Sequence, residues 1–191
     1  MAPRTAKQFE EIRRIKRKAI LDAALHVFAE EGFHSATISQ IAKKAAISKG
    51  LMYNYFESKE ALLKALLLNV FDDIMNIFDF ENTTELTRED FIYLLDKNIE
   101  IVLNDTQFWR LYFAIIAQPD VTAIVMDQML EKAEPYMRLF VGYFAKKGHA
   151  DPLSMMRYFA AVIDGVQMHI MLDPENFPVK KVKKMIIDQF A

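Results

Sequence analysis

The chain has 191 residues, of which 52% are hydrophobic and 26% are charged, and its formal net charge is −2. These proportions are typical of a globular domain, and no apolar run approaches the roughly 18 residues that a membrane-spanning helix needs. The sequence contains no cysteine, which excludes disulfides and thiolate metal sites, and its 5 glycines among many helix-forming residues favour an all-α fold.

The first predicted helix extends from Gln8 to Glu31, and Gly32 is a natural C-terminal stop. Apolar residues at helical spacing form the stripe that we expect to be buried: Ile12, Ile15, Ala19, Ile20, Ala23, Ala24, Val27 and Phe28. The N-terminus has no apolar core behind its charges, so it is not a secretory signal, and we expect a cytoplasmic protein. Residues 1–60 carry a net charge of +4 and residues 61–191 a net charge of −6. This asymmetry is consistent with phosphate binding by one end of the chain, or with an ordinary solvated helix.

Two short helices joined by a tight turn are predicted next. Thr37 is a good N-cap for the first, and Ser48 caps the second, which extends from Lys49 to Tyr55. A helix of about eight residues is marginal alone, so both must dock on neighbouring structure. A helix-turn-helix that inserts its second helix into the DNA major groove is the simplest interpretation.

The segment from Arg17 to Leu63, RKAILDAALHVFAEEGFHSATISQIAKKAAISKGLMYNYFESKEALL, resembles the TetR (tetracycline-repressor-like) family of bacterial transcription regulators. Its most diagnostic part is SKGLMYNYFESKEALL. The resemblance covers about a quarter of the chain. It implies a three-helix DNA-binding domain at residues 1–60, and a helical ligand-binding and dimerisation domain at residues 61–191, with about nine helices in all. Ala46 replaces the glycine that many members have at the turn, and in a left-handed conformation it would cost on the order of 1 kcal/mol.

Eight residues are candidates for DNA contact. Lys49, Gly50 and Leu51 begin the second short helix, where side chains and backbone best meet base edges. Leu51 replaces a threonine common in the family, and it can touch a thymine methyl group but cannot hydrogen-bond. Family members usually bind phosphates at the positions of Thr37, Tyr53 and Lys59, although Tyr53 has a core position as its alternative. The full set is Thr37, Ser48, Lys49, Gly50, Leu51, Tyr53, Tyr55 and Lys59.

Six further helices are predicted. Thr87 and Asp90 resemble a capping box at the start of one of them, and Pro135 should kink or break another. The predicted ranges are Lys59–Phe78, the residues from the Thr87 cap to Asn104, Thr106–Gln118, Val121–Lys147, the residues after Asp151 and Pro152 to Leu172, and Val179–Phe190. The last two carry more apolar surface than one helix pair needs, which predicts a homodimer through them.

The family resemblance also implies a ligand pocket among the C-terminal helices. The candidates combine large adaptable side chains with polar groups in an apolar region: Trp109, Tyr112, Phe113, Met126, Phe140, Asp164, Gln167 and His169. Aromatic residues and methionines at helical spacing are more often core, and the polar residues could equally close a dimer interface.

We therefore expect a repressor that a small apolar or amphipathic ligand releases from a palindromic double-stranded DNA operator. The alternative is a helical protein-interaction module that has lost sequence-specific DNA binding. An enzyme is not expected, because the sequence has no glycine-rich phosphate loop and its histidines lack metal-ligand spacing. We expect no cofactor, no metal and no membrane association.

Overall fold

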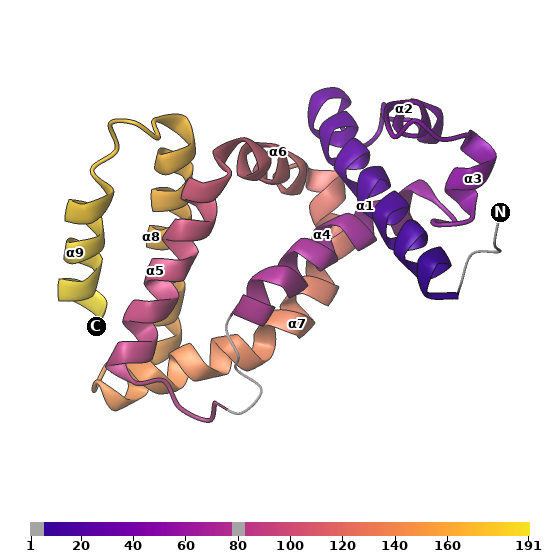
Figure 1. The fold of residues 1–191 in the computed structure, drawn as a ribbon. Helices are drawn as coiled ribbons and strands as arrows, with labels where there is room; N and C mark the ends of the chain where they lie inside the picture. The colour runs from indigo at the N-terminus through magenta and orange to yellow at the C-terminus, as the bar shows by residue number, and fades with distance from the viewer. Residues whose placement is uncertain (1–5, 78–82) are drawn as a thin grey trace. The chain divides into compact units, whose positions relative to one another are not determined.

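The computed structural model describes residues 6–77 and 83–191, and it contains nine α-helices and no strand within these ranges (Figure 1). The predicted all-α fold is therefore confirmed. The predicted end of the fourth helix at Phe78 lies outside the described residues. None of the helices in the described ranges is long and apolar enough to cross a bilayer. The helices are α1 Ala6–Glu31, α2 Ile38–Lys44, α3 Lys49–Tyr53, α4 Lys59–Ile77, α5 Arg88–Asn104, α6 Thr106–Ile116, α7 Pro119–Lys146, α8 Pro152–Leu172 and α9 Val179–Phe190.

The chain divides into two compact units, each made of two sequence segments. Unit 1 comprises Met1–Phe71 and Leu111–Asp127, and unit 2 comprises Asp72–Arg110 and Gln128–Ala191. Helices α4, α6 and α7 contribute residues to both units. The boundary at residue 60 separates predicted functions rather than compact units, and it stays a prediction.

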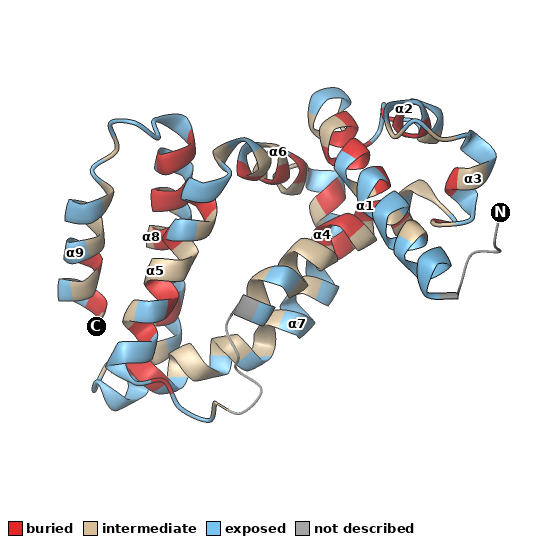
Figure 2. Ribbon diagram, in the orientation of Figure 1, coloured by how far each residue is buried: buried red, intermediate tan, exposed pale blue. Residues whose placement is uncertain are grey.

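The core of unit 1 forms where α1 packs against α2 and where α2 packs against α3. Buried positions run along α1, α2, α3 and α4, as Figure 2 shows in red. The fully buried side chains of this unit lie on these four helices and on the parts of α6 and α7 that belong to it: Ile20, Ala24, Phe28, Ile41, Met52, Leu62, Leu63, Leu67, Ile115, Val121 and Val125. The predicted stripe on α1 is buried only from Ile20 onward. Ile15 is 55% exposed and Ala19 is also exposed. The expectation that they are buried is wrong, because α1 starts several turns before the part that packs.

The core of unit 2 is a cluster of aromatic rings around Phe91 of α5. This ring is fully buried, stacks on Tyr143 with centroids 5.0 Å apart, and lies 4.8 Å from the ring of Phe159. Phe140 and Phe144 also contact the Phe91 ring. The cluster therefore joins α5, α7 and α8. Helix α7 continues through Pro135, so a break does not occur there.

Candidate nucleic-acid interface

The two short helices α2 and α3 each begin with the N-cap that the sequence predicted. The Thr37 hydroxyl accepts a bond of 3.2 Å from the amide of Gln40, and the Gln40 side chain accepts one of 2.8 Å from the Thr37 amide. The Ser48 hydroxyl accepts a bond of 3.1 Å from the amide of Leu51. These side chains thus satisfy first-turn amides, which have no acceptor within their own helix. Helix α3 ends at Tyr53, earlier than the predicted Tyr55.

The turn between α2 and α3 holds Ala46 in a left-handed conformation, with φ of 54°. It is the one non-glycine residue with positive φ in the described part of the chain. The backbone strain expected of Ala46 in a left-handed conformation is therefore present, and it costs on the order of 1 kcal/mol. The turn still closes, because the amide of Ile47 donates to the carbonyl of Ala42 at 3.0 Å.

Helix α3 buries one side and exposes the other. Met52 is fully buried, whereas Lys49 and Gly50 at its start are exposed, and Tyr53 is 48% exposed. Leu51 is half-buried. A Cβ built on Gly50 meets no atom within 4 Å, so this backbone is open to approach. The arrangement leaves a lysine, a bare backbone and a tyrosine hydroxyl available to an external partner.

Aromatic residues after α3 anchor it to α1. Phe56 is 5% exposed, and the guanidinium of Arg17 lies 5.4 Å from the centre of its ring. Tyr55 is half-buried in the same turn. Further along α1, Arg14 forms an ion pair of 2.7 Å with Glu11, and this bond lowers the pKa of that carboxyl. Arg14 is therefore partly neutralised, although it lies on the exposed start of the helix.

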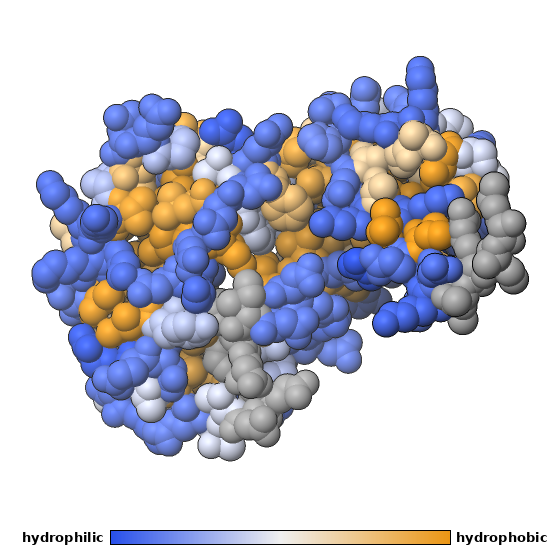
Figure 3. Space-filling model, in the orientation of Figure 1, coloured by the Kyte–Doolittle hydropathy of each residue, from blue (hydrophilic) through white to orange (hydrophobic). Residues whose placement is uncertain are grey.

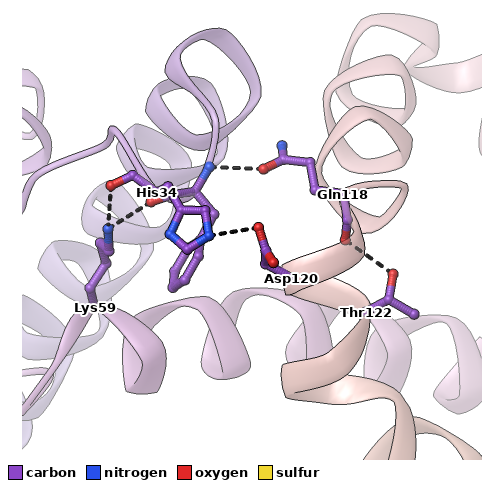
Figure 4. A network of polar contacts seen from close by, with 6 residues as sticks. His34, Lys59, Gln118, Asp120 and Thr122 are labelled. Atoms are coloured by element: carbon purple, nitrogen blue, oxygen red, sulfur yellow. Dashed lines mark hydrogen bonds and ion pairs between the residues drawn. The ribbon is translucent and has the colours of Figure 1, made fainter.

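Lys59, the first residue of α4, has protein partners for its ammonium group. Its Nζ donates to the carbonyl oxygens of Phe33 at 2.7 Å, His34 at 3.0 Å and Ala36 at 3.0 Å (Figure 4). The phosphate contact expected of this residue would therefore require it to give up one of these bonds.

The α1–α2 loop has a second set of partners that the sequence did not reveal. The side chain of Gln118, between α6 and α7, accepts a bond of 2.8 Å from the amide of Phe33 and donates to the carbonyl of Phe28 at 3.3 Å. His34 Nε2 lies 2.7 Å from the Asp120 carboxylate. Gln118 and Phe33 are 85 residues apart, so local sequence patterns do not reveal their contact.

The candidate ligand residues are divided between the two units. Five belong to unit 2, and they are Trp109, Phe140, Asp164, Gln167 and His169, while Tyr112, Phe113 and Met126 belong to unit 1. Trp109 is 7% exposed and donates to the carbonyl of Ile101, and Phe140 stacks on Phe159. Gln167 is buried and donates to Asn98 at 2.7 Å. These three side chains thus have partners within the protein, and a ligand role for them stays a prediction.

The remaining candidates differ in burial. Burial raises the pKa of Tyr112 to about 12, so its hydroxyl stays protonated at neutral pH. Phe113 is half-buried, and Met126 is 39% exposed. Asp164 and His169 are exposed, although partial burial still raises the pKa of Asp164, and His169 stacks on Phe177 at 5.8 Å. A ligand role for these residues stays a prediction.

Comparisons with known proteins agree with the helix-turn-helix geometry. Residues 20–66 match the family described as bacterial regulatory proteins, tetR family. The HTH-type transcriptional regulator UidR of Escherichia coli (strain K12) is 52% identical over 52 residues, which are 27% of this chain and 26% of UidR. This match therefore spans about a quarter of that relative's length. The HTH-type transcriptional regulator PksA of Bacillus subtilis (strain 168) is 25% identical over 177 residues, or 90% of this chain and 86% of PksA.

The fold also recurs in a solved structure along nearly the whole chain. The transcriptional regulator FadR from Bacillus subtilis, solved in complex with stearoyl-CoA, aligns with a TM-score of 0.71 at 18% identity. The alignment covers 91% of this chain and 96% of FadR. The likeness at this identity establishes a shared fold for both units.

Proposed function

We propose that this chain, which belongs to the tetR family of bacterial regulatory proteins, is a repressor that binds a palindromic DNA operator through α3. The observation that carries the proposal is the outward start of α3, where Lys49 and Gly50 are exposed while Met52 anchors the helix from behind. In this proposal Lys49 bonds a guanine edge or a phosphate, and the open backbone at Gly50 lets the DNA approach closely. Such a repressor acts in the cytoplasm, where its operator is.

The proposed repressor is a homodimer through α8 and α9. A helix as short as α3 reads only a few base pairs, and two copies are needed for useful selectivity. Several large apolar side chains on α8 and α9 are exposed: Leu153 48%, Tyr158 48%, Met168 56%, Leu172 67% and Met185 68%. Apolar side chains also reach the surface over α5, α8 and α9 in Figure 3. A partner copy that covers these residues removes apolar area from water, which favours association.

Equilibrium sedimentation at micromolar concentration tests the dimer. We expect a dimer for the natural chain and a monomer for the double variant Met168→Lys, Leu172→Lys, because each lysine would place an unpaired charge in the interface. Leu130→Lys is the matched control, since Leu130 is 48% exposed on α7, outside the proposed interface. A natural chain that sediments as a monomer would contradict the dimer.

The proposed regulation is release of the operator by a small apolar or amphipathic molecule. The support is the shared fold with FadR, whose structure contains stearoyl-CoA, together with the methionine- and aromatic-rich sequence of α6 and α7. Methionine side chains adapt to varied apolar ligands. The ligand and the operator would be linked through a coupling free energy between two sites.

Selection of bound sequences from a random duplex pool tests the operator directly. We expect enrichment of a palindrome, with binding that weakens steeply as salt concentration rises. Enrichment of no sequence by the folded dimer would contradict the proposal. That result would favour the alternative, a helical protein-interaction module. The alternative is suggested by Leu51, which is half-buried and whose side chain cannot form a hydrogen bond with DNA.

A further inference from the structure

The α1–α2 loop precedes the helix-turn-helix, and side chains from distant segments hold its backbone. Gly32 begins the loop with φ of 78°, and Thr37, the N-cap of α2, ends it. Within it, the amide of Phe33 and the carbonyls of Phe33, His34 and Ala36 are all bonded to side chains of residues 59 and 118. Backbone groups outside helices need such partners when water is excluded from them. The loop is therefore defined by these two side chains.

Lys59 uses its whole donor capacity on the loop. An ammonium group has three N–H bonds, and Lys59 has three carbonyl acceptors within 3.0 Å. Its Nζ also lies 4.6 Å from the centre of the buried Phe33 ring, which adds a cation–π attraction. A lysine at a helix N-terminus opposes the helix dipole. The negative ends of the three carbonyls offset that repulsion without any phosphate.

Gln118 and Asp120 contact the same loop through different groups. Gln118 bridges the two sides of the bend, because its Oε1 accepts from the amide of Phe33 while its Nε2 donates to the carbonyl of Phe28 at the end of α1. Asp120 pairs with His34. Figure 4 shows Lys59 on one side of the loop and Gln118 and Asp120 on the other. All of these residues belong to unit 1.

The α1–α2 loop is connected to α3, the helix that we propose binds the operator, in a way that affects the orientation of α3. Thr37 caps α2, α2 packs against both α1 and α3, and α3 carries Lys49 and Gly50 at its exposed start. A shift of the loop backbone therefore moves α2 and α3 together. We infer that Lys59 and Gln118 are positioning residues, which fix the α1–α2 loop and so set the sequence specificity of α3, and that Lys59 binds no phosphate. This inference rests on the proposed operator binding.

Salt dependence separates a positioning lysine from a phosphate-binding one. Each phosphate contact contributes about 0.9 to the slope of log affinity against log salt concentration, so losing one contact in each half-site lowers the slope by about 1.8. We expect Lys59→Met to weaken operator binding about tenfold, since the loop loses its anchor, while the slope stays within about 0.3 of the natural value. Affinity for a random duplex should stay unchanged, because non-specific binding depends on phosphates alone.

Three further variants complete the experiment. Gln118→Ala should reduce the ratio of operator affinity to random-duplex affinity, as Lys59→Met does, with no change in the slope of log affinity against log salt concentration. Gln118 bonds the opposite side of the loop from Lys59, so this variant tests the loop independently of the Lys59 charge. Lys59→Arg should restore much of the ratio, because a guanidinium can donate to the same carbonyls. Lys64→Met is the matched control, because five residues along a helix turn its side chain about 140° away from Lys59. This control should leave the ratio unchanged.

The outcomes also separate this inference from the proposed function. Circular dichroism is used first to find a temperature at which every variant is fully folded, so that affinity differences report on the folded state. If the natural chain selects no operator, the proposed function fails. If the natural chain binds and Lys59→Met lowers the slope by about 1.8, Lys59 is a phosphate contact and the inference is overturned. If Gln118→Ala leaves the affinity ratio unchanged, the positioning role of Gln118 is overturned.

Discussion

The α1–α2 loop and the aromatic cluster around Phe91 hold their surroundings in different ways. In the loop, a lysine and a glutamine donate and accept directed bonds to individual backbone groups. Around Phe91, four aromatic rings from α7 and α8 pack against its ring, and the hydroxyl of Tyr143 is the one polar group among these five side chains. Directed bonds fix orientation and contribute modestly to stability, whereas apolar burial contributes most of the free energy of folding. Substitutions in the two regions should therefore affect different properties.

The largest expected effect is on stability, from Phe91→Ala. Removing a fully buried ring from a packed cluster should lower the free energy of unfolding by about 3–5 kcal/mol, as measured by urea denaturation. Phe9→Ala is the matched control, because Phe9 is 58% exposed, and its effect should be below about 0.5 kcal/mol. A loss below about 1 kcal/mol at Phe91 would mean that the cluster is not the stabilising core of unit 2.

Next in size are the two helix caps, one in each unit. Thr37→Ala and Thr87→Ala should each lower the free energy of unfolding by about 1 kcal/mol at pH 7, because each removes the acceptor of a backbone amide. Thr37→Ala should also weaken operator binding, because this cap directly precedes the helix pair α2 and α3. Thr87→Ala should leave operator affinity unchanged. Denaturation and duplex titration of both variants check this contrast. If the two variants weakened operator binding equally, the idea that contacts within unit 1 set the orientation of α3 would be contradicted.

Ala46→Gly should stabilise the chain slightly. Glycine relieves the left-handed strain at this turn, which is on the order of 1 kcal/mol, and after its greater loss of conformational freedom is subtracted the net gain is at most about 0.5 kcal/mol. Ala45→Gly is the control, because Ala45 has φ of −77° and glycine there relieves no strain. Thermal denaturation that shows Ala46→Gly no more stable than Ala45→Gly would count against strain at this turn.

The smallest effect is a difference in pH dependence between the two caps. Hydrogen bonds from the Thr87 hydroxyl and amide lower the pKa of Asp90, so the folded state favours the carboxylate. The resulting stabilisation is present above the ordinary aspartate pKa of about 4 and is lost as pH falls through the lowered folded value. The penalty of Thr87→Ala should therefore shrink in this acid range, whereas that of Thr37→Ala should not, because Gln40 does not titrate. Urea denaturation of both variants and of the natural chain at several values between about pH 3 and about pH 7 measures the two penalties. Parallel pH dependence in the two variants would contradict this cause.

Local patterns predicted the helix-turn-helix well, because its determinants are close in sequence. The caps at Thr37, Ser48 and Thr87 follow from side chains that reach amides three residues away. The left-handed turn at Ala46 was anticipated as a possibility from the resemblance, and the structure has it.

Contacts between distant segments could not be predicted in this way. The bond from Phe33 to Gln118 spans 85 residues, and the carbonyl partners of Lys59 lie at least 23 residues away. The sequence likewise does not distinguish a core role from a ligand contact at Trp109 and Phe140, because both roles use large apolar side chains at helical spacing. The expected burial of Ile15 was wrong because periodicity indicates a face but not whether another element covers it.

Binding of the selected operator by Lys49→Ala and Tyr53→Phe tests the central claim most directly, namely that the exposed start of α3 reads DNA. We expect both variants to bind more weakly, with Lys49→Ala losing on the order of tenfold in affinity. Its free energy of unfolding should stay unchanged, because the Lys49 side chain is exposed in the free protein. Unchanged operator affinity in both variants would contradict the account and indicate that α3 serves another partner.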